Sequence, residues 1–136
     1  MYLKGPCVIL ALLFTVFSGV FGARRVKRQI IKTASVGGRK ILECNIVYPG
    51  GVYTPHVIKW NKKGIDTPVY VKFNTFSPHI DESYKDRIRL VEKASIELSN
   101  IKGTDEGWYE CIVNFMDGTD TTTQNGTWIY LSVNGE

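Results

Sequence analysis

The stretch DEGWYEC, residues 105–111, places a glycine, two large aromatic residues and a cysteine directly after two acids. Side chains alternate between the two faces of an extended strand, so Tyr109 and Cys111 would point to the same side. The spacing is too tight for a catalytic loop, and the acidic start does not suit the core face of a helix. We therefore interpret the stretch as a structural anchor that leads into a buried strand.

Outward from this anchor, short alternating apolar runs recur, and no segment shows a sustained helical period. Turn-forming stretches separate them, among them YPGG, KKG, KGTDEG and MDGTD. Seven or more short strands at this spacing favour a two-sheet β-sandwich, with a small barrel as the alternative. The expected strands are residues 39–47, 56–62, 68–73, 87–91, 94–98, 108–115 and 127–133, with an eighth at 30–35.

Residues 1–22 have the composition of a secretory signal peptide. Lys4 precedes the apolar run VILALLFTVF, and Val20 and Gly22 fit the positions that signal peptidase reads. The alternative is a membrane anchor, but the run is well short of the roughly 20 residues that cross a bilayer. We expect cleavage after Gly22 and secretion of the mature chain, which has no other segment able to span a membrane.

The net charge of +4 resides at the N-terminus, mostly in a basic tail at residues 23–29. From Gln29 onward, 12 Lys and Arg residues face 13 Asp and Glu residues, a balance of −1. This near-neutral domain, residues 30–134, does not support a basic groove for nucleic acid. Arg25–Arg28 (RVKR) matches the pattern that secretory convertases cut, and a solvated tail is the simpler interpretation. Residues 135–136 end the chain, either naturally or by truncation.

Removal of the leader takes Cys7 with it and leaves Cys44 and Cys111. Two cysteines in a secreted chain are expected to pair. In the chain-entropy model, a bridge across 66 intervening residues stabilises a fold by about 4 kcal/mol. The chain has no CxxC motif, and His56 and His79 have no neighbours at ligand spacing. We therefore predict neither a metal nor another cofactor.

Two spacings around these cysteines identify the kind of sandwich. Trp60 follows Cys44 by 16 residues, and Tyr109 precedes Cys111 by two. In an immunoglobulin sandwich these positions hold the tryptophan packed on the inter-sheet disulfide and the tyrosine corner. The predicted fold is all-β, an immunoglobulin-like β-sandwich of the variable (V-set) type with one inter-sheet disulfide.

Three further residues complete this signature. Asp105 is expected to accept charge-assisted hydrogen bonds from Arg87, at the start of the strand at 87–91. Gly107 would allow a close approach of another group to the backbone. The fold hosts many functions, so these residues identify structure alone.

Residues 56–133 also resemble one family specifically. The motifs are HVIKW, PVYVKF, SPHIDESYKDRIRL, DEGWYEC and NGTWIYLSVN, of which SPHIDESYKDRIRL is the most specific. Together they resemble the first immunoglobulin domain of the protein turtle family, called immunoglobulin superfamily member nine in other animals. The resemblance implies a neuronal cell-surface parent with further immunoglobulin domains, fibronectin type III domains and one transmembrane helix. It also implies roles in cell adhesion, including homophilic contact, and in axon, dendrite and synapse organisation.

A protein partner, including a second copy of the chain, would be expected on the outward face of one sheet. Aromatic residues beside charges resemble an interface centre with a polar rim. The alternative is that they are cross-strand packing partners on a solvated sheet. The candidates are Lys59, Tyr70, Lys72, Glu110, Ile112, Asn114, Trp128 and Tyr130, with Phe76 from a neighbouring loop.

That loop, residues 72–84, carries Phe73, Phe76 and His79. It is either a recognition loop on a rigid scaffold or a segment in which Phe73 and Phe76 fold under as a local cluster. His79 lies close to Asp81, and a single exposed histidine is not expected to have a functional role by itself.

Asn125-Gly126-Thr127 is the single N-x-S/T sequon. In a secreted chain it predicts N-glycosylation of Asn125, with an unmodified turn as the alternative.

Enzymatic motifs are absent from the sequence. It has no nucleophile elbow and no glycine-rich phosphate loop, and its clustered acids lie at predicted turns. We expect no enzyme and no small-molecule substrate. The predicted function is extracellular protein recognition in cell adhesion, at a neuronal cell surface if the chain is part of a longer parent. The alternatives are a soluble single-domain binding protein, such as a decoy or an immune-type recognition factor, and an inert structural module.

Overall fold

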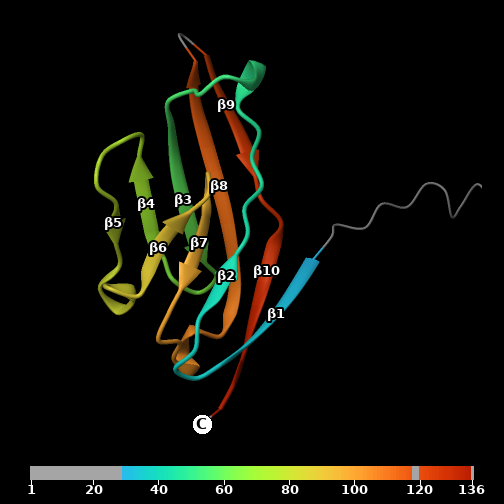
Figure 1. The fold of residues 1–136 in the computed structure, drawn as a ribbon, viewed down its shortest axis with the longest axis vertical. Coiled ribbons are helices and arrows are strands. Elements are labelled where there is room, and N and C mark those ends of the chain that lie inside the picture. Colours follow the sequence, from blue (N-terminus) through green and yellow to red (C-terminus); the bar gives the residue numbers. More distant parts are fainter. Residues whose placement is uncertain (1–28, 118–119, 136) are drawn as a thin grey trace, which may run out of the picture.

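The computed structural model describes residues 29–117 and 120–135. The predicted leader at 1–22 and the RVKR segment lie outside these residues. Two β-sheets face each other across one core (Figure 1). The larger sheet, called the main sheet below, has the order β1-β10-β8-β3-β4-β5, with β9 also paired to β8. Its strands are β1 (Gln29–Ser35), β3 (His56–Lys62), β4 (Tyr70–Phe73), β5 (His79–Ile80), β8 (Gly107–Asp117), β9 (Asp120–Asn125) and β10 (Trp128–Asn134).

The smaller sheet has the order β2-β7-β6. It consists of β2 (Lys40–Leu42), β6 (Ile88–Val91) and β7 (Ser95–Leu98). Within the part of the chain that the structure describes, three short 3-10 helices lie in the connections, at η1 (Pro49–Gly51), η2 (Glu82–Tyr84) and η3 (Gly103–Asp105). This architecture confirms the predicted immunoglobulin-like sandwich and excludes the barrel.

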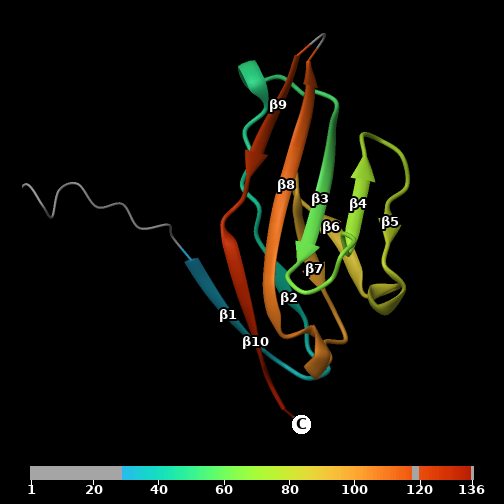
Figure 2. The same ribbon diagram turned by 180° about the vertical axis from the view of Figure 1, so that it is seen from behind.

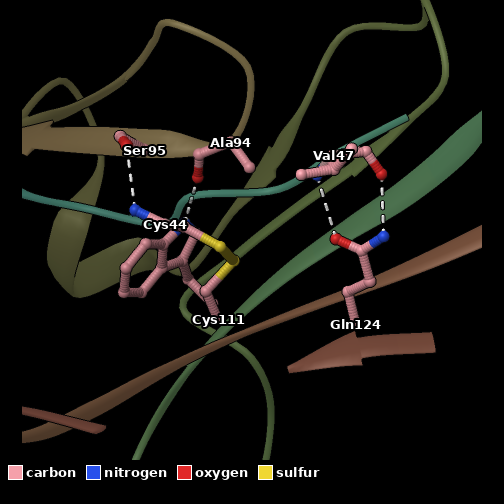
Figure 3. The surroundings of a disulfide bond; sticks show 7 residues. Cys44, Val47, Ala94, Ser95, Cys111 and Gln124 are labelled. Carbon is pink, nitrogen blue, oxygen red and sulfur yellow. Dashed lines mark hydrogen bonds between the residues drawn. A yellow bond between two sulfur atoms is a disulfide. The ribbon is translucent and has the colours of Figure 1, made fainter. Parts of the chain in front are cut away.

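The disulfide joins the two sides of the core, as predicted. Cys44 and Cys111 are bonded, and the Cys44 N–H donates to the Ser95 hydroxyl at 2.9 Å (Figure 3). Trp60 is fully buried beside them, opposite Cys111 in the β3–β8 register. Its indole N–H donates to the Ala94 carbonyl at 2.9 Å, so the buried polar atom is satisfied.

A side-chain clamp replaces strand pairing near the disulfide. The Gln124 amide donates to the Val47 carbonyl at 2.7 Å and accepts from the Val47 N–H at 3.1 Å (Figure 3). Together with the Ser95 bond to Cys44, this clamp serves backbone groups that a ladder would otherwise satisfy. The predicted strand 39–47 is therefore regular only over Lys40–Leu42.

The tyrosine corner has the expected hydrogen bond. The Tyr109 hydroxyl donates to the Asp105 carbonyl and also bonds the Tyr84 hydroxyl at 2.8 Å. The Asp105 carboxylate accepts from Arg87 at 2.7 and 3.0 Å and from the Lys102 N–H at 2.8 Å. Arg87 and Asp105 are both buried, at 7% and 2% exposure, so this bidentate pair lies out of water.

Gly107 adopts a φ of +146°, which disfavours other residues. A Cβ at Gly107 would lie 2.9 Å from the Lys62 Cε, so the glycine permits the close approach expected from the sequence.

Two strands were not anticipated. β5 contains only two residues, and β9 has the sequence DTTTQN, which lacks apolar alternation. The expected strand at 30–35 is present as β1, and it runs parallel to β10.

We expect Asp105→Asn to lower the free energy of unfolding by about 3–5 kcal/mol, because it leaves the buried Arg87 charge without its partner. The matched control is Arg89→Gln, which breaks a pair with Glu97 in which Arg89 is 68% exposed. That change should cost less than about 1 kcal/mol. Urea unfolding of the oxidised domain measures both, and equal losses would contradict a special contribution from the buried pair.

Gly126→Ala should destabilise the fold by about 1–3 kcal/mol, because the new Cβ would overpack the core. It would lie 3.3 Å from both the Cys111 Cβ and the Cys44 Sγ. Gly103→Ala is the control, since a Cβ there meets nothing within 4 Å. Thermal unfolding should show a lower Tm for Gly126→Ala alone, and an unchanged Tm would show that the disulfide can move aside.

Candidate functional site

The candidate site is the outward face of the main sheet, the side turned away from β2, β6 and β7 (Figure 2). Residues directly opposite each other on neighbouring strands share a face. Trp60 and Cys111 lie opposite each other and are buried. The next pair along the ladder, Lys59 and Ile112, therefore faces outward. The same alternation places Glu110 and Asn114 outward, in agreement with the prediction.

Three half-buried aromatic residues gather on this face, where β8 and β10 run side by side. Trp108 lies with its ring centroid 5.1 Å from that of Tyr130 and 6.5 Å from that of Trp128. We call this group of three the aromatic end. Beside it lies an open hollow of about 290 Å³, lined by Gln29, Lys63, Trp108 and Trp128.

Glu106 holds Tyr130 in place. Its carboxylate accepts from the Tyr130 hydroxyl at 3.1 Å and from the Val133 N–H at 2.8 Å. These hydrogen bonds, with that from Val133 as the larger cause, lower the pKa of Glu106, and the same pairing raises the pKa of Tyr130. The hydroxyl of Tyr130 is therefore held by a charged group, and the side chain stays half-buried on the outward face.

Charges of both signs lie on the central strands of this face. Lys59 is on β3, and Glu110 is on β8 opposite Asn61. Lys59 and Glu110 are therefore diagonal neighbours, with Ile112 beside them. We call Ile112, together with the neighbouring Lys59 and Glu110, the aliphatic centre. An apolar residue beside one positive and one negative group is suited to a partner surface that carries the same three kinds of group, because each charge can meet its opposite.

The prediction that Tyr70 and Lys72 face outward is wrong. Tyr70 lies opposite Trp60, and Lys72 lies opposite Ile58, so both belong to the core side of β4. Tyr70 is 1% exposed, and burial raises its pKa to about 12. The Lys72 stem runs along the core edge, and its ammonium donates to the carbonyls of Asn74 and Phe76 at 3.1 and 2.8 Å.

Phe73 and Phe76 form a stacked pair with ring centroids 5.7 Å apart. They are 47% and 65% exposed, so the pair forms without folding under the domain. Tyr53 is linked to this loop, since its hydroxyl donates to the Asn74 side chain.

Sequence reasoning missed several members of the outward face. Trp108 is the most important, and its signal was available because it lies two residues before Glu110 on the same strand. Val71 and Phe73 occupy the outward positions on β4 that had been assigned to Tyr70 and Lys72.

Within residues 29–117 and 120–135, no group of three or more His, Cys, Asp or Glu side chains is arranged to hold a metal ion. Over the same ranges, no helix is long and apolar enough to cross a membrane.

Comparison with known proteins places this geometry in context. No family model matches the chain. Mouse protein turtle homolog B is 36% identical over 120 residues, 88% of this chain, and Drosophila protein turtle is 37% identical over 111 residues, 74% of this chain. The V domain of amphioxus IgVJ-C2 aligns with a TM-score of 0.62 and 27% identity, over 75% of this chain and 98% of that domain.

The chain is a homologue of the turtle proteins. It spans only 9% of the length of the mouse turtle homologue and 7% of the Drosophila protein. The turtle relationship therefore concerns one immunoglobulin domain, and the anchor residues described above belong to that domain.

Glu106→Gln should remove a pH-dependent part of the stability of this turtle-related domain. A lowered folded-state pKa stabilises the fold above the unfolded pKa, and this contribution is lost as pH falls through the folded pKa. The wild type should therefore have the higher urea midpoint at about pH 6, and the difference from the variant should shrink by about pH 3. A difference that stays constant with pH would contradict a role for the carboxylate charge.

Proposed function

We propose that the domain mediates protein recognition in cell adhesion outside the cell, with the outward face of the main sheet as the contact surface. The observation that carries the proposal is the aromatic end beside an aliphatic centre. Aromatic residues bury large areas and are enriched among the residues that dominate binding energy. The turtle relatives support an adhesion setting, and we extend the proposal to a neuronal cell surface on the same resemblance.

The proposed partner is a second copy of the chain. In a twofold contact, residue i of one copy meets residue j of the other, and the reverse pair forms as well. Lys59 and Glu110 are diagonal neighbours of opposite charge, so a twofold arrangement can place each against its opposite in the partner. The domain is nearly neutral from Gln29 onward, so two copies would meet without strong net repulsion.

One observation favours a second candidate, a soluble binding protein with an unrelated partner. Four large apolar residues are exposed around one end of the sandwich: Val52, Tyr53, Phe73 and Phe76. Loops at this end of variable domains can carry recognition, and a flat sheet contact would leave them free. In that case Phe76→Lys would weaken binding and substitutions on the sheet face would not.

Sedimentation velocity over a concentration series distinguishes these functions. We expect the secreted wild type to dimerise with rising concentration, and Tyr130→Lys to weaken dimerisation at least about tenfold by placing a charge in the contact. The introduced ammonium would still have Glu106 as a local partner, so the variant should fold.

The matched control is Ile41→Lys, which changes a residue 41% exposed on β2 of the other sheet. It should dimerise like the wild type. A wild type that stays monomeric at every concentration would overturn self-recognition by this domain.

A further inference from the structure

Strand β1 leaves one edge of the main sheet open. It ends the order of that sheet and lies on its outside in both ribbon views (Figures 1 and 2), and no other strand within residues 29–117 and 120–135 pairs with its open side. On the other side, the Val36 N–H continues the parallel ladder with β10 by donating to the Asn134 carbonyl at 3.1 Å. N–H and C=O groups of successive strand residues point to opposite edges, so those of Gln29, Ile31 and Thr33 face the open side.

This edge has few of the features that keep exposed strands apart. β1 is seven residues long, QIIKTAS, and has neither proline nor glycine. Its single charged side chain, Lys32, is already paired with Glu43 at 3.3 Å. The other edge strands are short or polar: β5, β2 and β6 have two, three and four residues, and β9 has the sequence DTTTQN. A long edge whose one charge is paired is a ready template for strand addition.

A row of apolar side chains on the outward face leads to this edge. Trp108 lies opposite Tyr130, and Tyr130 lies opposite Ile31. Trp108 and Tyr130 are half-buried, whereas Ile31 is 70% exposed. The row therefore stops at an exposed isoleucine that has a cross-strand neighbour on one side and an open edge on the other.

We propose that β1 pairs with β1 of a second copy, antiparallel and centred on Ile31, so that the two main sheets join into one. Ile31 would lie opposite Ile31 of the second copy, and the apolar row would run unbroken from one aromatic end to the other. This edge contact is independent of the outward-face contact, and only the use of the joined row in recognition rests on the proposed function.

The residues of β1 disfavour the neighbouring registers. A pair centred on Lys32 would place two ammonium groups directly opposite each other, and like charges in that position are destabilising. A pair centred on Thr33 would require the Ser35 carbonyl, which already accepts from the Gly38 N–H at 2.9 Å. In these two registers Ile31 would lie opposite a hydroxyl-bearing residue, Thr33 or Ser35 respectively.

The register centred on Ile31 has neither cost. It places Gln29 opposite Thr33, and both residues turn their N–H and C=O groups to the open edge, so each pair can exchange both hydrogen bonds. On the core side it places Ile30 opposite Lys32, whose methylene stem can cover the isoleucine. The pair is thus complementary to itself, as a twofold contact requires.

The edge contact would be weak by itself, because a single edge strand offers much less area than the roughly 800 Å² per partner of a stable complex. Its effect would be to place two aromatic ends on the same side of one sheet. Neighbouring strands are about 4.8 Å apart, so the two Tyr130 positions, three strand spacings apart, would be separated by about 14 Å. A partner surface that meets both ends would bind more tightly than one that meets a single end.

Cysteine cross-linking of the full secreted chain tests this register. The Cα atoms of a hydrogen-bonded antiparallel pair lie about 5.5 Å apart, within the range of a disulfide, so Ile31→Cys should form a linked dimer on mild oxidation. Thr33→Cys is the matched control, because its two copies would be offset by four residues, about 14 Å along the strand. We expect Ile31→Cys to cross-link at least about tenfold faster than Thr33→Cys. Intact mass checks that the buried Cys44–Cys111 bridge is retained.

Two double variants separate the edge from the outward face. Adding Thr33→Pro to Ile31→Cys removes an N–H that faces the open edge, a position at which edge strands tolerate proline. The domain should keep its Tm, and cross-linking should fall to the level of Thr33→Cys. Adding Tyr130→Lys instead should leave the cross-link, because the Tyr130 side chain takes no part in the β1 ladder.

The outcomes distinguish this inference from the proposed function. Equal cross-linking of Ile31→Cys and Thr33→Cys, no linked dimer from either, or a linked dimer that survives Thr33→Pro would overturn the edge pairing. If the edge pairing fails but Tyr130→Lys still weakens dimerisation in sedimentation velocity, the outward-face contact stands. If Ile31→Cys cross-links as expected but Tyr130→Lys sediments like the wild type, the edge pairing stands and the outward-face contact fails.

Discussion

The packing of Trp60 on the Cys44–Cys111 bridge is the constraint on which the other features depend. The bridge ties the segment leading out of β2 to the centre of β8, and Trp60 fixes β3 beside it through the Trp60–Cys111 register. Since the side-chain period of a strand is two, one inward residue decides the orientation of every other residue on that strand. A slip by one position would bury Glu110 and expose Cys111.

This parity explains why much of the outward face was predictable. On β8 the cysteine orients Glu110, Ile112 and Asn114, and on β3 the tryptophan orients Lys59. Both anchors, Cys111 and Trp60, are identified by their spacing in the sequence, so the outward positions on these strands can be assigned without the structure. Trp108 follows from the same rule, because it lies two residues before Glu110 on the same strand.

The errors fall where no anchor was available. β4 has neither a cysteine nor a tryptophan to fix which of its faces is inward, and alternation assigned without such an anchor placed Tyr70 and Lys72 on the wrong side. In the structure the Lys72 ammonium reaches loop carbonyls from a core-side position, and Tyr70 fills the core. Likewise, β9 is built from threonines whose pairing depends on the hairpin with β8, and the end of the predicted strand 39–47 is held by side chains of Ser95 and Gln124. Such tertiary hydrogen bonds leave no periodic signal in the sequence.

The same constraint also connects the core with the surface at the sequon. Gly126 must approach the disulfide closely, which interrupts the last strand between Asn125 and Trp128. The interruption ends the β8–β9 ladder at Asn125, whose partner Ile112 is outward because Cys111 is inward. It also begins β10 with Trp128, beside Trp108. One packing requirement at the centre of the domain thus sets where the polar strand β9 ends and where Trp128 enters the outward face.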